Sequence, residues 1–372
     1  MANVLDLKRR IRSVRNTRQI TKAMKMVSAA KLRRAQERAV ASRPYTQMMA
    51  SVIQSLMRRI EIYDPKTGEP RHPLLVPREE KNVLLVVVSG DKGFAGAFNS
   101  NITKAAFRFL GEQEGKGVDI EAIGRKARDI FRRRYPAAQM EEDQAATEDE
   151  AEQHHRLSDE GHMQQLRRRG ERSAPVEITG DHPGMLEKLS FDSVSELGRE
   201  IVDRFVHGEI DAAYVVFNEF KSVIAQRVVV ERMIPLAEPG KRDVAQAEEP
   251  TREERERAGH AAQTAGVSLA EADTAEADEE ARRFGTAEVD YIYEQDPGEM
   301  LRDLLPRFVS TQLYRAMLES VASEHAARMT AMDSATNNAS EMIDDLTLTM
   351  NRVRQAAITK EIIEIVSGAA AL

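Results

Sequence analysis

Three glycines at a spacing of three residues are the pattern in this 372-residue sequence that comes nearest to an enzyme site. Gly90, Gly93 and Gly96 follow an apolar β-branched run and precede a segment with helical periodicity. Glycine allows the backbone amides at the start of a helix to approach a phosphate closely. However, the spacing differs from G-x-G-x-x-G, Asp91 adds a negative charge, and no Walker lysine–serine pair follows. The pattern therefore favours a structural turn between a strand and a helix over a nucleotide site, and no cofactor is expected.

Histidine and cysteine are the other residue types that could do chemistry here. His154, His155 and His162 lie in a polar segment, but their spacing specifies no further metal ligand. His325 has no second candidate ligand three or four residues away. The chain has no cysteine, which excludes disulfides, thiolate metal sites and cysteine nucleophiles. Because no Ser/His/Asp group or paired carboxylates can be recognised either, we expect no catalytic residue and no metal site.

The first 60 residues are expected to form one long basic helix that is kinked at Pro44. Residues 3–43 contain neither Gly nor Pro and consist mainly of good helix formers. Apolar side chains recur along it at helical spacing, with one polar gap: Val4, Leu7, Ile11, Val14, Ile20, Met24 and Val27. Fifteen lysines and arginines against two acidic residues give this segment a net charge of +13, whereas the whole chain carries −7.

Residues 296–372 are expected to form a second long helix. Asp296, Pro297 and Glu299 are typical of a helix start, and Pro306 is expected to bend the helix. Farther on, positions in alternating steps of four and three form a coiled-coil seam: Leu318, Ala322, His325, Met329, Met332, Thr336, Ala339, Ile343, Leu346, Met350, Val353 and Ala357. At about 1.5 Å per residue, residues 304–366 reach about 90 Å, so the helix must project from a domain of ordinary size. We predict an antiparallel rod in which the basic first helix covers this seam and faces its acidic residues.

The middle of the chain, residues 78–295, is expected to form an α/β domain with a parallel or mixed sheet. Strand-like runs alternate with helical segments. The strands are expected at 82–89, 118–123, 212–220 and 226–235, and the helices at 102–110, 125–134 and 193–206.

Two charged inserts, residues 137–174 and 238–281, interrupt this alternation. Both are rich in Glu, Asp, Gln, Ala and Arg and have almost no aromatic or β-branched residues. Such a composition buries too little apolar area to offset the entropy lost on ordering. We therefore expect solvated loops or marginal surface helices in both.

The residues alone favour a mechanical or scaffolding role but leave several partners open. A basic N-terminal segment is typical of nucleic-acid binding, of an acidic protein partner or of a transit peptide. The apolar pattern continues past residue 40 without a cleavage-like break, which disfavours the transit peptide. Aromatic residues are missing before Tyr45, which disfavours single-stranded nucleic acid. No segment of about 18 consecutive apolar residues is present, so no membrane span is expected.

Two terminal motifs closely resemble those of the gamma subunits of F-type ATP synthases. The first is KRRIRSVRNTRQITKAMKMV at residues 8–27 with ASRPY at 41–45, and the second is RQAAITKEIIEIVSGA at residues 354–369. Internal segments are also similar to the family's motifs: DKG at 91–93, with Gly96 and Asn99, and SEHAARM at 323–329. The resemblance covers residues 1–135, 176–237 and 286–372, whereas the two charged inserts depart from the shorter bacterial pattern.

This resemblance implies a Rossmann-like α/β domain plus a long antiparallel coiled coil of the N- and C-terminal helices, at residues 1–60 and 296–372. It implies a central-stalk rotor subunit without catalytic residues. Such a subunit transmits rotation between the membrane c-ring and the catalytic alpha/beta ring and couples proton flow to ATP synthesis or hydrolysis. The implied partners are the alpha, beta and epsilon subunits and the c-ring, with no nucleic acid. The implied location is the cytoplasmic face of the bacterial inner membrane, which is contacted only through the c-ring. A stand-alone coiled-coil scaffold or a nucleic-acid-binding protein is the alternative.

By the same resemblance, five residues are expected to meet the beta subunits. Four of them lie near the C-terminus: Arg354, Gln355, Thr359 and Glu361. The fifth, Met24, is expected in the same contact zone on the opposite helix. Simple packing in the helix seam is an equally good interpretation of Met24.

Overall fold

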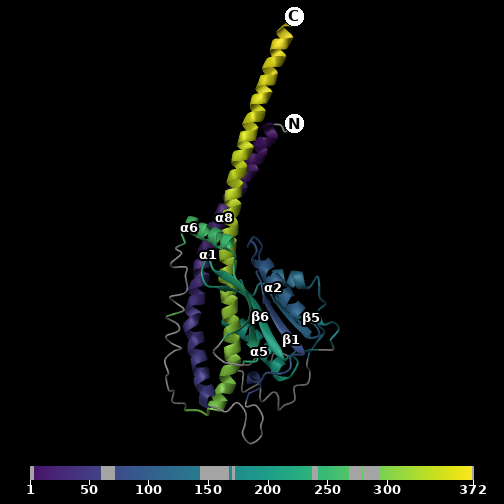
Figure 1. Cartoon of the computed structure of the whole chain (residues 1–372), viewed down its shortest axis with the longest axis vertical. Coiled ribbons are helices and arrows are strands. Elements are labelled where there is room, and N and C mark those ends of the chain that lie inside the picture. The colour runs from purple at the N-terminus through teal and green to yellow at the C-terminus, as the bar shows by residue number, and fades with distance from the viewer. Residues whose placement is uncertain are drawn as a thin grey trace.

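Two long helices formed by the two ends of the chain run side by side in opposite directions (Figure 1). The computed structural model describes residues 4–59, 72–142, 167–169, 172–236, 242–267, 279 and 294–370. Helix α1 (Val4–Arg59) continues through Pro44, and helix α8 (Pro297–Ala370) continues through Pro306. Thr21 and Lys25 of α1 contact Thr336 and Asp333 of α8, so residue numbers rise on one helix as they fall on the other. The predicted antiparallel rod is therefore confirmed.

The buried stripe of α1 differs from the predicted one in its middle turns. Ile20 and Val27 were expected to face the partner helix, but their side chains are 60% and 55% exposed. Thr21, Lys25 and Ser28 are buried instead. The alternating steps of four and three that begin at Leu7 and Ile11 continue through these polar positions to Leu32, Ala35 and Ala39. Helix geometry thus overrides residue polarity here, because Thr21 and Lys25 find polar partners on α8.

A six-stranded mixed sheet forms the centre of the body, which is the part of the molecule beside the lower half of the two long helices (Figure 1). Its order is β5-β2-β1-β6-β7-β8. The first four strands in this order are parallel to one another, whereas β7 pairs antiparallel with both β6 and β8. The bounds are β1 (Asn82–Val88), β2 (Gly117–Ile123), β5 (Val176–His182), β6 (Ala212–Phe220), β7 (Gln226–Ile234) and β8 (Asp243–Glu248).

Helices cover both faces of this sheet. On one face, α2 (Phe98–Glu112) and α3 (Arg125–Phe131) pack against Val83, Leu85 and Val87 of β1. On the other face, α5 (Phe191–Val206) packs together with α1 and α8 against Leu84, Val86 and Val88. A short 3-10 helix, η1 (Pro73–Leu75), adds Leu74 and Leu75 to this second core. The root of α8 is therefore part of the body's own core and is not merely attached to it.

The prediction that the two inserts form solvated loops or marginal surface helices is wrong where the structure describes strands in them, whereas one described segment is a surface helix as expected. In the first insert, β3 (Met140–Glu142) pairs antiparallel with β4 (Arg167–Arg169). In the second, residues 243–248 form strand β8 of the main sheet, and α6 (Arg252–Thr264) packs on the long helices. Backbone pairing and ion pairs hold the strand, and the packed face of α6 consists of alanines, so neither has the apolar pattern that was sought. His154, His155 and His162 lie outside the described residues.

Candidate partner-binding surface

Buried polar contacts hold α1 and α8 together in the shaft, which we define as the two long helices beyond the body. The Thr21 and Thr336 hydroxyl groups are 2.8 Å apart, and Lys25 Nζ donates to Asp333 Oδ1 at 3.0 Å. Burial acts to raise the pKa of Asp333, but hydrogen bonds from Lys25, His260 and Thr264 outweigh it and lower that pKa. A buried pair of this kind is worth more for fixing the register of two helices than for stability.

The tip of the shaft is a single helix, because α8 extends well past the start of α1 (Figure 1). Every residue from 354 to 367 is exposed. Arg354, Gln355, Thr359 and Glu361 are all on this stretch, where Thr359 Oγ1 donates to the Gln355 carbonyl at 3.0 Å. Branched apolar side chains, between 48% and 71% exposed, are interspersed with them: Ile358, Ile362, Ile363, Ile365 and Val366. Exposed apolar side chains gathered on one short stretch are typical of a protein interface.

Met24 does not lie beside these four residues. Its neighbours Thr21 and Lys25 bind Thr336 and Asp333, which places Met24 level with a point about twenty residues before Gln355 along α8. At 1.5 Å per residue the separation is about 30 Å. Met24 is half-buried against the partner helix. The structure thus does not bring Met24 into one contact zone with Arg354, Gln355, Thr359 and Glu361.

The basic residues of α1 mostly face outward and not toward α8. Lys8, Arg12 and Arg15 are exposed and, with Thr347 and Met350 of α8, line a hollow of about 480 Å³. The prediction that the basic face of α1 would pack on the acidic residues of α8 is therefore wrong for this stretch. A row of exposed guanidinium and ammonium groups beside an apolar seam suits an acidic protein surface.

The glycine turn after β1 holds α8 close to the sheet. A Cβ atom on Gly90 would lie 2.8 Å from Glu324 Oε1 of α8, so glycine permits this close approach. Arg328 Nε of α8 donates to the Gly93 carbonyl at 3.3 Å. The Asp91 carboxylate accepts the amide at the start of α3, from Arg125, at 3.0 Å. A carboxylate of this chain thus occupies the N-terminus of α3, whereas the glycine turn itself leads into α2.

A buried ion-pair network between α8 and β7 is a second attachment of the shaft to the body, and sequence reasoning missed it. Arg315 Nη2 of α8 contacts both carboxylate oxygens of Glu231 at 2.8 and 3.0 Å, and Arg242 Nη2 contacts the same carboxylate at 2.7 Å. Burial acts to raise the pKa of Glu231, but the two guanidinium groups outweigh it and lower that pKa. Arg315 and Glu231 are 84 residues apart, so no local pattern could have paired them.

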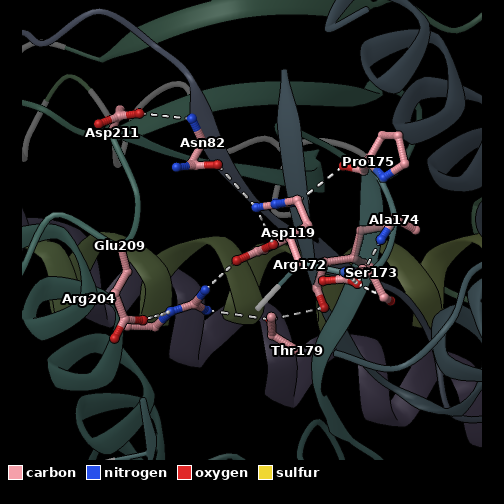
Figure 2. A network of polar contacts seen from close by, with 12 residues as sticks. Asn82, Asp119, Arg172, Ser173, Ala174, Pro175, Thr179, Arg204, Glu209 and Asp211 are labelled. Carbon is pink, nitrogen blue, oxygen red and sulfur yellow. Dashed lines mark hydrogen bonds and ion pairs between the residues drawn. The ribbon is translucent and has the colours of Figure 1, made fainter. Parts of the chain in front are cut away.

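The body itself is stiffened by a buried charge network at its β2–β5 edge (Figure 2). Asp119 of β2 has a fully buried side chain, which accepts from Arg172 at 2.9 Å and from Arg204 of α5. Arg204 also contacts Glu209 at 3.2 Å, and Arg172 reaches Asn82 at 3.3 Å. The network thus joins β1, β2, α5 and the segment that leads into β5. All its drawn carboxylates and guanidinium groups have partners, so it is a structural network and offers no ligand site.

Within the described residues there is no cluster of three or more His, Asp or Glu side chains able to hold a metal ion. The helices among the described residues also include none with the length and apolar character that a bilayer crossing requires.

Comparison with known proteins gives consistent results along the whole chain. A family model described as ATP synthase matches residues 3–372. The ATP synthase gamma chain of Solibacter usitatus is 43% identical over 371 residues, covering 100% of this chain and 99% of the relative. That of an Anaeromyxobacter species is 37% identical, with 100% of both chains covered. A chain in the cryo-EM structure of the Euglena gracilis mitochondrial ATP synthase has a similar fold, with a TM-score of 0.50 and 16% identity over 99% of this chain and 94% of that chain.

Proposed function

The chain belongs to the ATP synthase gamma-chain family, the non-catalytic subunits of the central stalk, and from this we propose that it transmits rotation between a membrane c-ring and a catalytic ring of alpha and beta subunits. The observation that supports this most is that α8 forms the single exposed helix at the tip of the shaft while its lower part belongs to the body's core. A rotor needs these two properties together, since its tip must bind partner subunits and its lower part must not turn relative to the body.

Two of the attachments described above suit the transmission of torque. Glu231 of β7 binds Arg315 of α8, and Gly93 in the turn after β1 binds Arg328, so two separate parts of the body hold the same helix. Each contact is buried or half-buried and is therefore less screened by salt than a surface pair. Rotation of the body would thus turn α8 with it.

The uneven surface of the shaft supplies the other requirement. A rotating shaft can change the nucleotide affinity of catalytic sites only if its different faces bind the different conformations of those sites unequally. Exposed basic residues such as Lys8, Arg12 and Arg15 are on α1, whereas the tip of α8 is apolar with scattered charges. Each orientation of the shaft would therefore present a different surface to a given subunit of the ring.

The finer assignments are part of this proposal. We assign the tip residues Arg354, Gln355, Thr359 and Glu361 to contacts with beta subunits, which their exposure permits. The body is assigned to the epsilon subunit and the c-ring, which places the chain at the cytoplasmic face of the bacterial inner membrane and couples the motor to protons.

Reconstitution tests the proposal. The purified chain is mixed with the alpha and beta subunits of the same organism, and ATP hydrolysis by the isolated complex is measured. We expect a ring that hydrolyses ATP only when this chain is present. A chain whose tip carries Ile358→Glu and Ile362→Glu should assemble more weakly, whereas a chain with Lys360→Glu, an exposed neighbour, serves as the matched charge control. Failure of the unaltered chain to assemble would overturn the proposal, as a stand-alone scaffold or nucleic-acid tether predicts.

Met24 gives a separate test of coupling. Met24 is half-buried in the shaft, and a lysine there would place a charge at the junction of the two helices or against a beta subunit. We expect the Met24→Lys complex to hydrolyse ATP but to pump fewer protons per ATP. The measurement is the pH gradient formed by membrane vesicles at a matched rate of hydrolysis. An unchanged ratio of protons to ATP would contradict the assignment of Met24.

A further inference from the structure

Helix α6 lies against the long helices where the shaft leaves the body (Figure 1). It belongs to the second charged insert and begins with a capping box, in which Thr251 and Glu254 bind each other's backbone amides. Its outward face carries exposed charges, whereas Ala258, Ala261 and Ala262 are buried. A helix with such a narrow alanine face has one surface it can pack tightly, and that surface is used here.

Small residues on both sides let α6 approach the shaft closely. The cluster that they form contains Ala261, Ala262 and Ala265 from the α6 segment, Ala29, Leu32 and Ala35 from α1, and Ala322, Ala326 and Met329 from α8. Side chains from all three helices therefore share one apolar core at the neck of the shaft. Leu32, Ala261 and Ala262 in it are fully buried.

One carboxylate joins the same three helices. Asp333 of α8 is 4% exposed and accepts from Lys25 of α1 at 3.0 Å. Its two oxygens also accept from α6, where His260 Nδ1 lies at 2.9 Å and Thr264 Oγ1 at 3.0 Å. Lys25 Nζ donates in addition to the Thr264 carbonyl at 3.4 Å. Asp333 is thus the point at which α1, α6 and α8 are fixed relative to one another.

The other end of this insert is fixed to the sheet. Strand β8 pairs with β7, from Glu248 opposite Val228 to Asp243 opposite Arg232. Glu248 also forms an ion pair with Arg108 of α2. Glu249, which lies between β8 and α6, binds Arg227 of β7 at 3.2 Å and Arg255 of α6 at 3.3 Å. Three residues, 249–251, separate the strand from the helix, so the connection has little slack.

We propose that β8 and α6 form a strap that fixes the angle between the body and the shaft, with Asp333 as its positioning residue. The strap adds a third attachment to those at Glu231 and Gly93, and it is the one that reaches α1 as well as α8. Its mechanical role rests on the proposed function, because only a rotating shaft loads it. The packing on which it depends does not rest on that function.

The absence of cysteine from the chain makes the packing directly measurable. Spin labels are placed on Glu256→Cys of α6 and Asn338→Cys of α8, both exposed positions, and the distance between them is measured by pulsed EPR on the full chain. Ala262→Glu puts a charge into the shared core and should broaden the distance distribution, whereas Gln263→Glu, at the exposed adjacent position, should not. Equal distributions in the two variants would overturn the strap.

A milder variant tests the part played by Asp333. His260→Ala with Thr264→Val removes the two side-chain contacts of α6 with Asp333 and leaves the Lys25 pair intact. Both positions lie on the exposed side of the alanine face, so the fold should survive, which far-UV circular dichroism checks. We expect a broader label distance here too. A distribution like that of the unaltered chain would show that Asp333 positions nothing through α6.

The assembled ATP synthase tests the mechanical role. A probe on the body of the surface-held complex reports the angular fluctuation of the shaft when the catalytic ring is stalled. We expect a larger angular variance for His260→Ala with Thr264→Val than for the unaltered complex. An equal number of ATP sites in the two complexes checks that both are fully assembled. An unchanged angular variance together with a broadened label distance would overturn the mechanical role of the strap. Failure of the unaltered chain to assemble would instead count against the proposed function, and the EPR result would still decide the packing.

Discussion

At the scale of single residues, the body depends on charges that are buried and paired. Asp119 has no exposed side-chain surface and is held between Arg172 and Arg204 (Figure 2). Gly117 in the same strand leaves room for this arrangement, since a Cβ atom there would lie 2.5 Å from the Arg172 guanidinium carbon. Replacing one member of such a set leaves the others charged and without a counterion in a poorly solvated place.

Removing the Asp119 carboxylate should therefore be costly. We expect Asp119→Ala to lower the free energy of unfolding by about 3–5 kcal/mol, because Arg204 stays buried without its main partner. Urea unfolding followed by circular dichroism measures this. Asp181 is the matched control, since its ion pair with Arg132 at 3.1 Å is partly exposed and should contribute about 1 kcal/mol or less. If Asp119→Ala lowered the free energy of unfolding no more than Asp181→Ala, the stabilising role of the buried network would be contradicted.

His72 should make stability depend on pH. Burial, with a smaller effect of Arg302, lowers the pKa of His72 to about 4. Between pH 4 and 6.5, His72 thus binds a proton in the unfolded chain but not in the folded chain. The contribution of neutral His72 to the free energy of unfolding is therefore complete above pH 6.5 and falls as the pH decreases. At pH 5 the loss should be about 2 kcal/mol. His72→Asn retains an acceptor for the Leu74 amide and cannot titrate, so its unfolding free energy should fall less between pH 7 and 5. Equal pH dependence in both proteins would refute this.

At the scale of helices and strands, the periodicity of a helix could be predicted from the sequence, whereas the partners of its polar residues could not. The seam of α8 was predicted well, and its positions from Leu318 to Val353 are buried or half-buried. The seam of α1 was misplaced at Ile20, because Thr21 is buried by a partner 315 residues away in the chain. Strand β8 was missed for a similar reason, since it is held by the backbone of β7 and by ion pairs with distant residues such as Arg108, and not by apolar side chains of its own.

The corrected seam of α1 leads to a direct comparison of two isoleucines. Ile20 is 60% exposed, whereas Ile53 of the same helix is fully buried in the core against the sheet. We expect Ile53→Ala to cost about 2–5 kcal/mol of unfolding free energy and Ile20→Ala less than about 0.5 kcal/mol. Chemical unfolding of the isolated chain measures both. A large loss at Ile20 would restore the stripe predicted from the sequence.

At the scale of the whole molecule, stability should decrease along the shaft. Near the body, α8 is covered by α1, α5 and α6, farther out by α1, and from residue 354 every described side chain up to 367 is exposed. The relative position of α1 and α8 is set by contacts such as Thr21–Thr336 and not by either sequence alone. For this reason the sequence could predict two long helices but not the separation of Met24 from Gln355.

Hydrogen exchange can test this gradient. A lone helix of this length is marginally stable in water, so amides of residues 354–366 should exchange far faster than those of residues 318–339 in the isolated chain. Mass spectrometry of peptic fragments resolves the two regions. Adding alpha and beta subunits should slow exchange at 354–366 if the ring encloses the tip. Equal protection of both regions in the isolated chain would mean that the tip is covered by something else.

The antiparallel pairing of the two ends also has a consequence for biosynthesis. Thr21 leaves the ribosome 315 residues before Thr336, its partner in the shaft. At about 5–20 residues per second, the first helix waits roughly 15–60 s for the second. During that delay its future contact surface is open to chaperones and to other nascent chains. The hydroxyl and ammonium groups of Thr21, Lys25 and Ser28 interrupt this surface with groups that water solvates well, which lowers the risk of aggregation before the last helix is made.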